Sequence, residues 1–170
     1  MAYIKSINGH TPKFGENCFV ADNATVVGAV TMGENCTVWF NAVVRGDVNS
    51  IAVGDNTNIQ DGAIIHGTYE KSKTIIGNNV SIAHNAVVHG CTIEDNVLIG
   101  IGAIILDDSV VGKNSVVAAG AVVLAGTQIP EGSIFAGVPA KKVKEIGPEM
   151  KEVIIRTAKN YPMYAKWYKS

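Results

Sequence analysis

The sequence predicts an all-β fold, a parallel β-helix of six-residue repeats followed by one C-terminal α-helix. Two observations predict it. Aliphatic or aromatic residues recur at every sixth position through most of the chain, and the composition is 47% hydrophobic but only 6% aromatic, with 18 glycines in 170 residues. A period of six does not match the helical period of about 3.6 residues, whereas it fits short strands joined by tight corners, three to a coil.

The large residues that anchor these repeats form one series along the chain. They are Phe14, Val20, Val26, Met32, Val38, Val44, Val53, Ile59, Ile65, Ile76, Ile82, Val88, Ile93, Ile99, Ile105, Val111, Val117, Val123, Ile129 and Phe135. Four places after an anchor the residue is small or β-branched, as at Cys18, Ala24 and Cys36. We expect the anchors to fill the interior, and Gly, Asn and Asp to relieve the corners. Twenty anchors correspond to about seven coils.

The end of the chain changes from this period to helical spacing. After "FAGVPAKKV" the apolar residues predict a helix over roughly 148–160, with Pro148 at its start. Pro162 should break or kink it, and a second short helical piece should follow. We expect the helix to pack along the β-helix and cover apolar surface. The chain is thus read as a β-helix over 1–140 and a helical tail over 141–170, a single domain overall.

Composition and charge exclude several classes of function. Fourteen Lys and Arg against fifteen Asp and Glu leave a formal charge of −1, without a basic run, so nucleic acid is not an expected partner. We find no signal-peptide pattern and no window of ~18 uninterrupted apolar residues, which predicts a cytoplasmic protein that does not enter a membrane. Cys18, Cys36 and Cys91 form no C-x-x-C motif and are read as reduced structural thiols. His10 is read as an ordinary surface residue.

The repeat slips around the remaining histidines. The intervals that depart from six are nine residues from Val44 to Val53, eleven from Ile65 to Ile76, and five from Val88 to Ile93. Arg45, His66 and His89 each follow an anchor by one position. We assume that the first two insertions bulge as loops, "GTYEKSK" being the longer one. The three residues then form a vertical row on one face of three successive coils, about 4.8 Å apart.

This row predicts a metal site shared between chains. His66 and His89 can aim their rings at one ion, but His84 lies on the preceding face, across a face nearly 20 Å wide. Three prisms packed about a threefold axis would bring His84 of one chain to His66 and His89 of the next. Three neutral imidazoles with one open position are typical of catalytic zinc, which lowers the pKa of bound water toward ~7.

Polar residues near the row suggest supporting roles. Gln60 and Asn58 are neutral hydrogen-bonding residues suited to orienting such a water or a substrate. Arg45 and Asp47, in "VVRGDV", form a charged pair before the site, and we expect them to form an intersubunit salt bridge that fixes the trimer, with or without a metal.

Several segments in order resemble one known family. They are "VVRGD", "NIQDGAIIH", "NNVSIAHNAVVHG", "AGVPAKKV" and a tail ending "NYPMYAKWYK". This combination resembles the gamma-class carbonic anhydrases among hexapeptide-repeat proteins. The resemblance implies a left-handed β-helix assembled as a homotrimer, with Zn, or Fe(II) as the alternative, bound by His66 and His89 of one subunit and His84 of the next.

The resemblance also implies an activity, that of a lyase. A metal-bound hydroxide would attack CO2 to give bicarbonate, and Gln60 and Asn58 would orient the hydroxide and the CO2. Arg45 and Asp47 would hold the interface, and Tyr161 would line the pocket.

The sequence departs from the family pattern in two places. Val48 stands where a glutamate would follow the aspartate of the RGD-like segment, and Glu70 is the one acid in the short loop "GTYEKSK". Proton export would therefore run through Glu70, through buffer, or slowly.

Two rival classes remain open at this stage. Hexapeptide acyltransferases share the repeat and use one histidine as general base, which would be His66, His84 or His89, with no need for all three. The other rival is a non-catalytic trimeric scaffold that retains a vestigial metal site.

Overall fold

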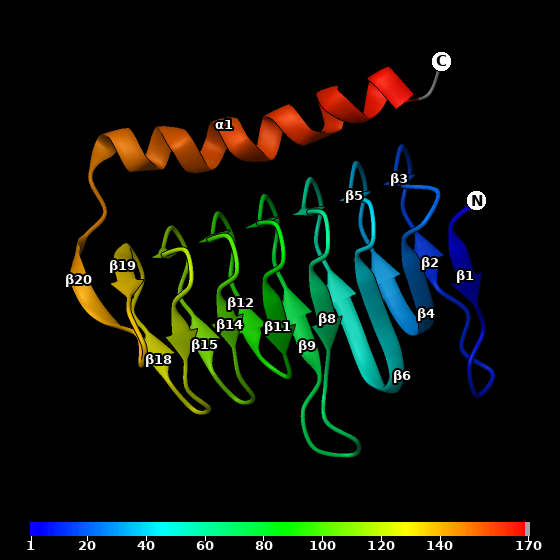
Figure 1. Ribbon diagram of the computed structural model, residues 1–170, viewed down its shortest axis with the longest axis horizontal. Coiled ribbons are helices and arrows are strands. Elements are labelled where there is room, and N and C mark those ends of the chain that lie inside the picture. Colours follow the sequence, from blue (N-terminus) through cyan, green and yellow to red (C-terminus); the bar gives the residue numbers. More distant parts are fainter. Residues whose placement is uncertain (169–170) are drawn as a thin grey trace.

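The protein folds as a parallel β-helix of about seven coils with one C-terminal α-helix, which confirms the predicted fold class (Figure 1). The computed structural model describes residues 1–168. The coils stack from the N-terminal end to the C-terminal end, and strands of successive coils pair in parallel register. Three flat faces result, which we name A, B and C.

The strands of each face recur once per coil. Face A contains β1 (Tyr3–Lys5), the first parts of β4 (Thr25–Met32) and β6 (Val43–Val53), β8 (Ile64–His66), β11 (Val87–His89), β14 (Ile104–Ile105) and β17 (Val122–Val123). Face B contains β2 (Lys13–Phe14), the last parts of β4 and β6, β9 (Thr74–Ile76), β12 (Thr92–Ile93), β15 (Val110–Val111) and β18 (Gln128–Ile129). Face C contains β3 (Phe19–Val20), β5 (Thr37–Val38), β7 (Asn58–Ile59), β10 (Ser81–Ile82), β13 (Leu98–Ile99), β16 (Val116–Val117), β19 (Ser133–Ala136) and the antiparallel β20 (Lys141–Glu145).

The first insertion in the repeat is not the loop that the spacing suggested. β6 runs unbroken from face A onto face B, so the extra residues lengthen a strand that bends over the corner, and Arg45 and Asp47 lie within it. The neighbouring β4 bends beside it at Gly28, whose φ is +77°. A Cβ on Gly28 would lie 2.3 Å from the Gly46 carbonyl oxygen, so only glycine allows the two strands to approach here.

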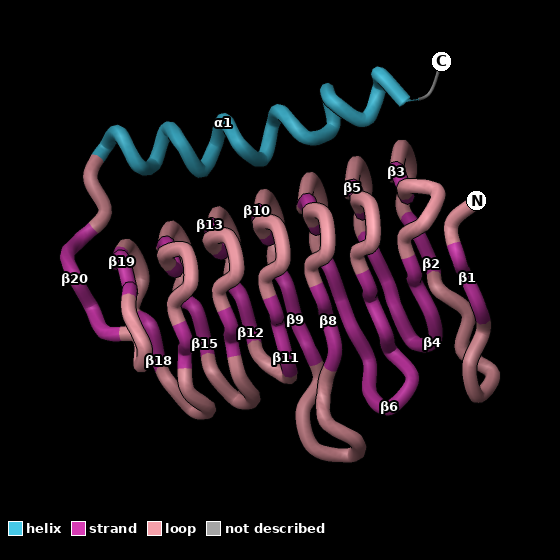
Figure 2. The backbone as a smooth tube through the Cα atoms, in the orientation of Figure 1, coloured by secondary structure: helices cyan, strands magenta, loops and turns pink. Residues whose placement is uncertain are grey.

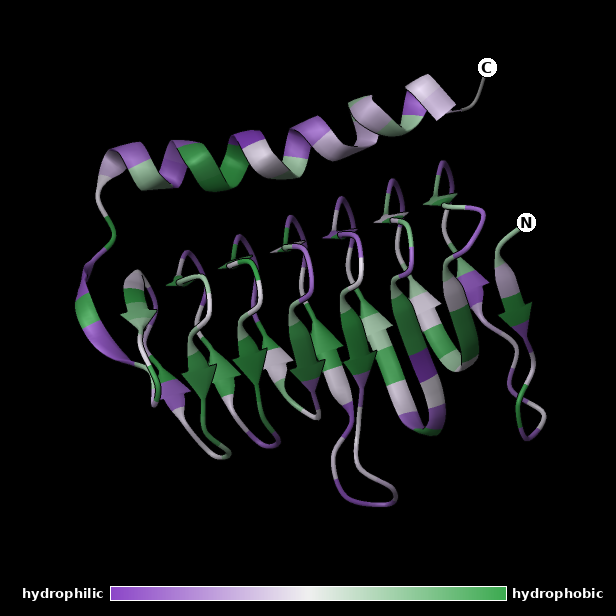
Figure 3. Cartoon of the chain, viewed as in Figure 1, coloured by the Kyte–Doolittle hydropathy of each residue, from purple (hydrophilic) through white to green (hydrophobic). Residues whose placement is uncertain are grey.

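The interior and the corners follow the predicted pattern. Every anchor from Val26 to Phe135 is buried, and the small residues such as Ala24 and Cys36 are buried beside them. Figure 3 shows mainly hydrophobic strands and hydrophilic corner segments. Asparagines occupy corners with positive φ, for example Asn35 at 55° and Asn56 at 54°, joined by a 3.2 Å side-chain hydrogen bond. Stacked amides therefore support the left-handed backbone that each corner requires.

The C-terminal helix begins where predicted but ends later. α1 (Pro148–Ala165) starts with Pro148 in the first turn and continues through Pro162, followed by the 3-10 helix η1 (Lys166–Tyr168). The expectation that the helix ends near 160 was therefore wrong. Ala158 and Ala165, on either side of the proline, are both buried, so packing along the coils outweighs the missing N–H of Pro162. Neither α1 nor η1 is long and apolar enough to cross a membrane.

The helix and the longest loop occupy different sides of the β-helix. α1 runs along it back toward the N-terminal coils and contacts β5, β7 and β10 of face C. The loop at 67–73, between β8 and β9, projects on the side away from α1 (Figure 2). This arrangement leaves face A without a cover from the chain's own helix.

Candidate metal centre

His66 and His89 meet as the register predicted. They pair directly in the ladder between β8 and β11, one coil apart. His66 Nδ1 and His89 Nε2 lie 3.1 Å apart, and the ring centroids are separated by 5.1 Å. The side chains are 14% and 29% exposed, so both rings open to the surface at one edge of face A.

A carboxylate holds the outer nitrogen of each ring. Asp47 Oδ1 lies 3.1 Å from His66 Nε2, and Asp107 Oδ1 lies 2.7 Å from His89 Nδ1. Burial alone would raise the pKa of Asp47, but hydrogen bonds from Arg45 and His66 lower it below its usual value. Partial burial, with the positive charge of Arg45, lowers the pKa of His66. Both rings are thus oriented by ionised partners on their outer sides.

The pair fits a metal ion as two of its ligands. Two nitrogens bound to one tetrahedral ion at ~2.0–2.1 Å lie roughly 3.3 Å apart, close to the separation found here. Carboxylates on the outer nitrogens are the usual support of metal-bound imidazoles. Within residues 1–168 of a single chain, no group of three His, Cys, Asp or Glu side chains is arranged to hold an ion.

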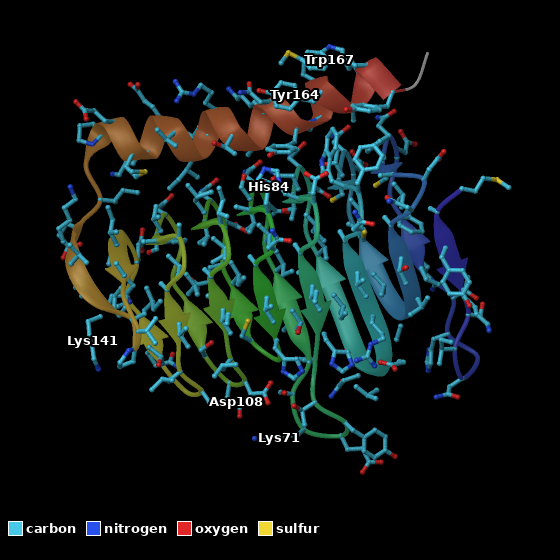
Figure 4. The ribbon with its side chains drawn as sticks, in the orientation of Figure 1. Lys71, His84, Asp108, Lys141, Tyr164 and Trp167 are labelled. Atoms are coloured by element: carbon cyan, nitrogen blue, oxygen red, sulfur yellow. The ribbon has the colours of Figure 1, made fainter. Side chains whose placement is uncertain are left out.

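His84 lies at a different corner, between faces C and A. Its Nδ1 is 2.9 Å from Asp61 Oδ2, and both side chains are about two-fifths exposed, at 41% and 42%. Figure 4 shows His84 on the side that faces α1, whereas Lys71 and Asp108 lie on the opposite side, beside the 67–73 loop. One chain therefore keeps His84 apart from the other two histidines.

Asn58 and Gln60 are buried on face C beneath the helix. Gln60 Nε2 donates to Asn58 Oδ1 at 2.9 Å, and Asn58 Nδ2 donates to Ser81 Oγ at 2.8 Å. Gln60 lies one residue before Asp61, so this amide chain leads toward the corner that carries His84. The two amides therefore lie on the side of the β-helix that carries His84, and not beside His66 and His89.

Tyr161 lies at that same corner. Its ring packs edge-on against Trp39, at 5.4 Å between centroids, and lines a pocket of about 210 Å³ together with Asp61. Burial, reinforced by the negative charge of Asp61, raises the pKa of Tyr161 to about 12. The hydroxyl therefore stays protonated at neutral pH.

The other predicted site residues are Glu70, Arg45 and Asp47. Glu70 is exposed at the turn of the 67–73 loop, with φ of 52°, and no hydrogen bond or ion pair joins it to a histidine in the described chain. Arg45 Nη1 lies 2.5 Å from Asp47 Oδ2 in the same chain, so the charged pair forms within one subunit.

Comparison with known proteins identifies the family of this chain. The family described as Bacterial transferase hexapeptide (six repeats) matches residues 11–46 and 90–125. Gamma carbonic anhydrase 2, mitochondrial, of Arabidopsis thaliana is 42% identical over 163 residues, which are 93% of this chain and 59% of the plant protein. The carbonic anhydrase of Geobacillus kaustophilus is 35% identical, over 98% of this chain and 91% of that protein. The chain belongs to the gamma-class carbonic anhydrase family.

Membership of the gamma-class carbonic anhydrase family confirms the predicted resemblance. The chain spans about three-fifths of the length of the Arabidopsis relative. The crystal structure of a hexapeptide transferase family protein from Anaplasma phagocytophilum has a TM-score of 0.93 and 34% identity, covering 98% of each chain. The fold is thus shared with proteins described as transferases, and the site has to decide between the chemistries.

Sequence reasoning on this gamma-class carbonic anhydrase relative missed two carboxylates, Asp61 and Asp107. Asp61 and His84 both stand two positions after an anchor, Ile59 and Ile82, so the six-residue register could have paired them. Asp107 likewise stands two positions after an anchor, Ile105, which pairs with Val88, so the register could have placed it beside His89; its hydrogen bonds from Thr68 and Ser72 depend on the 67–73 loop, which the register does not set.

Proposed function

We propose that the protein catalyses the metal-dependent, reversible hydration of CO2 to bicarbonate at a site shared between the subunits of a homotrimer. The observation that carries this proposal is the pair His66 and His89, with facing nitrogens 3.1 Å apart and a carboxylate behind each ring. A histidine that acts as general base for acyl transfer needs no second histidine facing it. Zn is the proposed metal, with Fe(II) as the alternative.

The surface of face A supports the trimer. Strand residues alternate, so the neighbours of the buried anchors point outward. On face A the residues that precede the anchors are Thr25, Val43, Ile64, Val87, Ile104 and Val122, none of them fully buried. On face B they are Lys13, Thr31, Ala52, Ile75, Thr92, Val110 and Gln128, most of them polar, and face C is covered by α1. Face A is therefore the apolar side that a second copy of the chain would cover.

The positions of the histidines match this packing. His66 and His89 end their strands at one edge of face A, and His84 stands at the corner that leads into β11 at the other edge. When three copies place face A toward a common axis, the His84 edge of one copy adjoins the His66 and His89 edge of the next. All three ligands are then neutral imidazoles.

Each of the site residues named above has a part in the proposed reaction. A divalent ion held by three histidines lowers the pKa of water enough to allow hydration near neutral pH. Asp47 and Asp107 orient two of the rings, and Asp61 orients His84. Asn58 and Gln60 orient CO2, and Tyr161 lines the pocket. Protons leave through exposed Glu70 or directly to buffer.

The remaining proposals concern the interface and the location. Arg45 and Asp47 contribute to the trimer interface, because they adjoin the edge at which copies would meet. We also propose a cytoplasmic protein, supported by Cys36 and Cys91, which are buried thiols outside any disulfide.

Metal analysis and a CO2-hydration assay on one preparation test the function. Wild-type protein purified anaerobically should carry about one Zn or Fe per chain and hydrate CO2, since a trimer has as many interfaces as chains. His84→Ala should lose both properties. His10→Ala, at an exposed histidine outside the proposed ligand set, is the matched control and should lose neither.

Two outcomes would contradict the proposal. A metal-free protein that transfers acetyl groups from acetyl-CoA would establish the acyltransferase. Metal without CO2 hydration under any metal loading would establish the scaffold.

A further inference from the structure

The 67–73 loop is closed on itself and directed at the histidine row. The Thr68 amide donates to the Ser72 carbonyl oxygen at 3.0 Å, so the two residues face each other across the loop. Their hydroxyls then leave the loop in the same direction. Thr68 Oγ1 donates to Asp107 Oδ2 at 2.7 Å, and Ser72 Oγ donates to Asp107 Oδ1 at 3.0 Å.

Asp107 joins this loop to His89. It follows β14 in the coil after His89 and accepts the 2.7 Å contact from His89 Nδ1 in addition to the two hydroxyl bonds. Its side chain is only 20% exposed. A carboxylate with both oxygens engaged by separate elements has one orientation available, so it can impose one orientation on the ring.

The backbone beside His89 is shaped to admit this carboxylate. Gly90 has φ of +57°, and a Cβ at this position would lie 2.0 Å from Asp107 Oδ1 and 2.2 Å from Ser72 Oγ. Any side chain at Gly90 would therefore push Asp107 or the loop away from His89. Close approach between three separate segments at one glycine indicates a built contact rather than a chance surface pair.

The end of the loop is also tied to the strand that carries His66. The Gly90 amide donates to Thr74 Oγ1 at 3.0 Å, and Thr74 Oγ1 donates to the His66 carbonyl oxygen at 2.5 Å. Thr74 begins β9, directly after the loop. The segment from Thr68 to Thr74 is thus tied to the backbone of both histidine strands and to the carboxylate behind His89.

We propose that Asp107 is a positioning residue for the metal ligand His89, and that Thr68 and Ser72 of the 67–73 loop hold Asp107 in place. The inference rests on the proposed metal site and deepens it. In this chain the loop therefore holds the ligand pair His66 and His89 in position, and we call this role of the loop a clamp. The role does not depend on the route by which protons leave. The ring of His89 is kept with Nε2 toward His66 because Nδ1 is occupied by Asp107.

Zinc affinity of the full chain tests the role of Asp107. Apoprotein is titrated with Zn²⁺ against a chromogenic chelator, and with Co²⁺ while the visible absorption spectrum is recorded. Asp107→Ala should bind Zn²⁺ about 10 to 100 times more weakly and change the Co²⁺ spectrum. Asp107→Asn retains an acceptor for His89 and should lose less. Asp108→Ala is the matched control, because that neighbouring carboxylate is exposed and contacts Lys71 at 3.7 Å.

A second variant tests the clamp without touching the carboxylate. Thr68→Val combined with Ser72→Ala removes both hydroxyl donors and should weaken Zn²⁺ binding severalfold, with the mass by light scattering unchanged. If Asp107→Ala does not assemble, Asp107→Asn and this double variant decide the question.

The outcomes separate this inference from the proposed function. Wild-type protein that binds Zn²⁺, with Asp107→Asn and the double variant equal to Asp108→Ala, would overturn the positioning role and leave the metal site intact. Wild-type protein that binds neither Zn²⁺ nor Co²⁺ would overturn both.

Discussion

Subunit complementation tests most directly whether the metal site is shared between chains. His84→Ala and His89→Ala are each expected to be inactive alone, because each removes one ligand from every site. Co-expressed with different tags, they form mixed trimers. A site is restored wherever a His84→Ala subunit supplies His66 and His89 and its neighbour, carrying His89→Ala, supplies His84.

The expected magnitude follows from that geometry. With equal amounts and random assembly, each interface has a one-in-two chance of the required subunit on either side, so about a quarter of the sites are intact. Metal content and CO2 hydration should both recover to about a quarter of wild type. Trimers carrying both tags are purified in sequence before these assays, which removes the homotrimers and raises the recovered fraction further.

A mixture of His66→Ala and His89→Ala provides the control. These two residues pair in the same chain, with nitrogens 3.1 Å apart, so no mixed interface has both of them on one side. This mixture should recover nothing. Failure of the first mixture to recover, although mixed trimers are isolated, would refute a site in which His84 comes from the neighbour, and so would equal recovery in the two mixtures.

Two further predictions concern the interface and the pocket. Arg45→Glu places a second carboxylate beside Asp47 and should weaken the trimer by several kcal/mol, seen as a lower mass by light scattering at low protein concentration; an unchanged mass would count against the interface role. Tyr161, with its pKa raised to about 12 from 10.0, favours its neutral form in the folded protein, so this stabilisation is complete below pH 10 and is lost as pH rises toward 12. In an absorbance titration of folded protein, Tyr161→Phe should remove a tyrosine ionisation with a pKa of about 12; an unchanged curve would refute the effect of the pocket on the pKa of Tyr161.

Much of the fold follows from the sequence because the repeat converts residue number into position. Val44 and Ile65 pair as the register requires, and so do His66 and His89, since each pair has the same place in successive coils. The corners were also predictable, because a left-handed backbone selects Gly, Asn and Asp. Such local rules need no knowledge of distant contacts.

The errors come from places where distant contacts outweigh local preference. Pro162 is a helix breaker by itself, yet α1 continues past it because Ala158 and Ala165 are buried along the coils. The insertion before Val53 was expected as a loop, but β4 offers it a partner strand, and it extends β6 instead. Neither outcome is written in the neighbouring residues.

The site divides in the same way. The sequence by itself determined which histidines stack, and on which face, because the six-residue period is a short-range property of the chain. Only the tertiary structure decided the contacts that hold the groups around those histidines in place. Asp107 reaches His89 from the next coil and is held there by hydroxyl groups of the 67–73 loop. The helix α1 returns along the coils, covers Asn58 and brings Tyr161 to Asp61. These contacts join segments far apart in the chain, and their geometry is set by the sum of the packing between them rather than by any one motif.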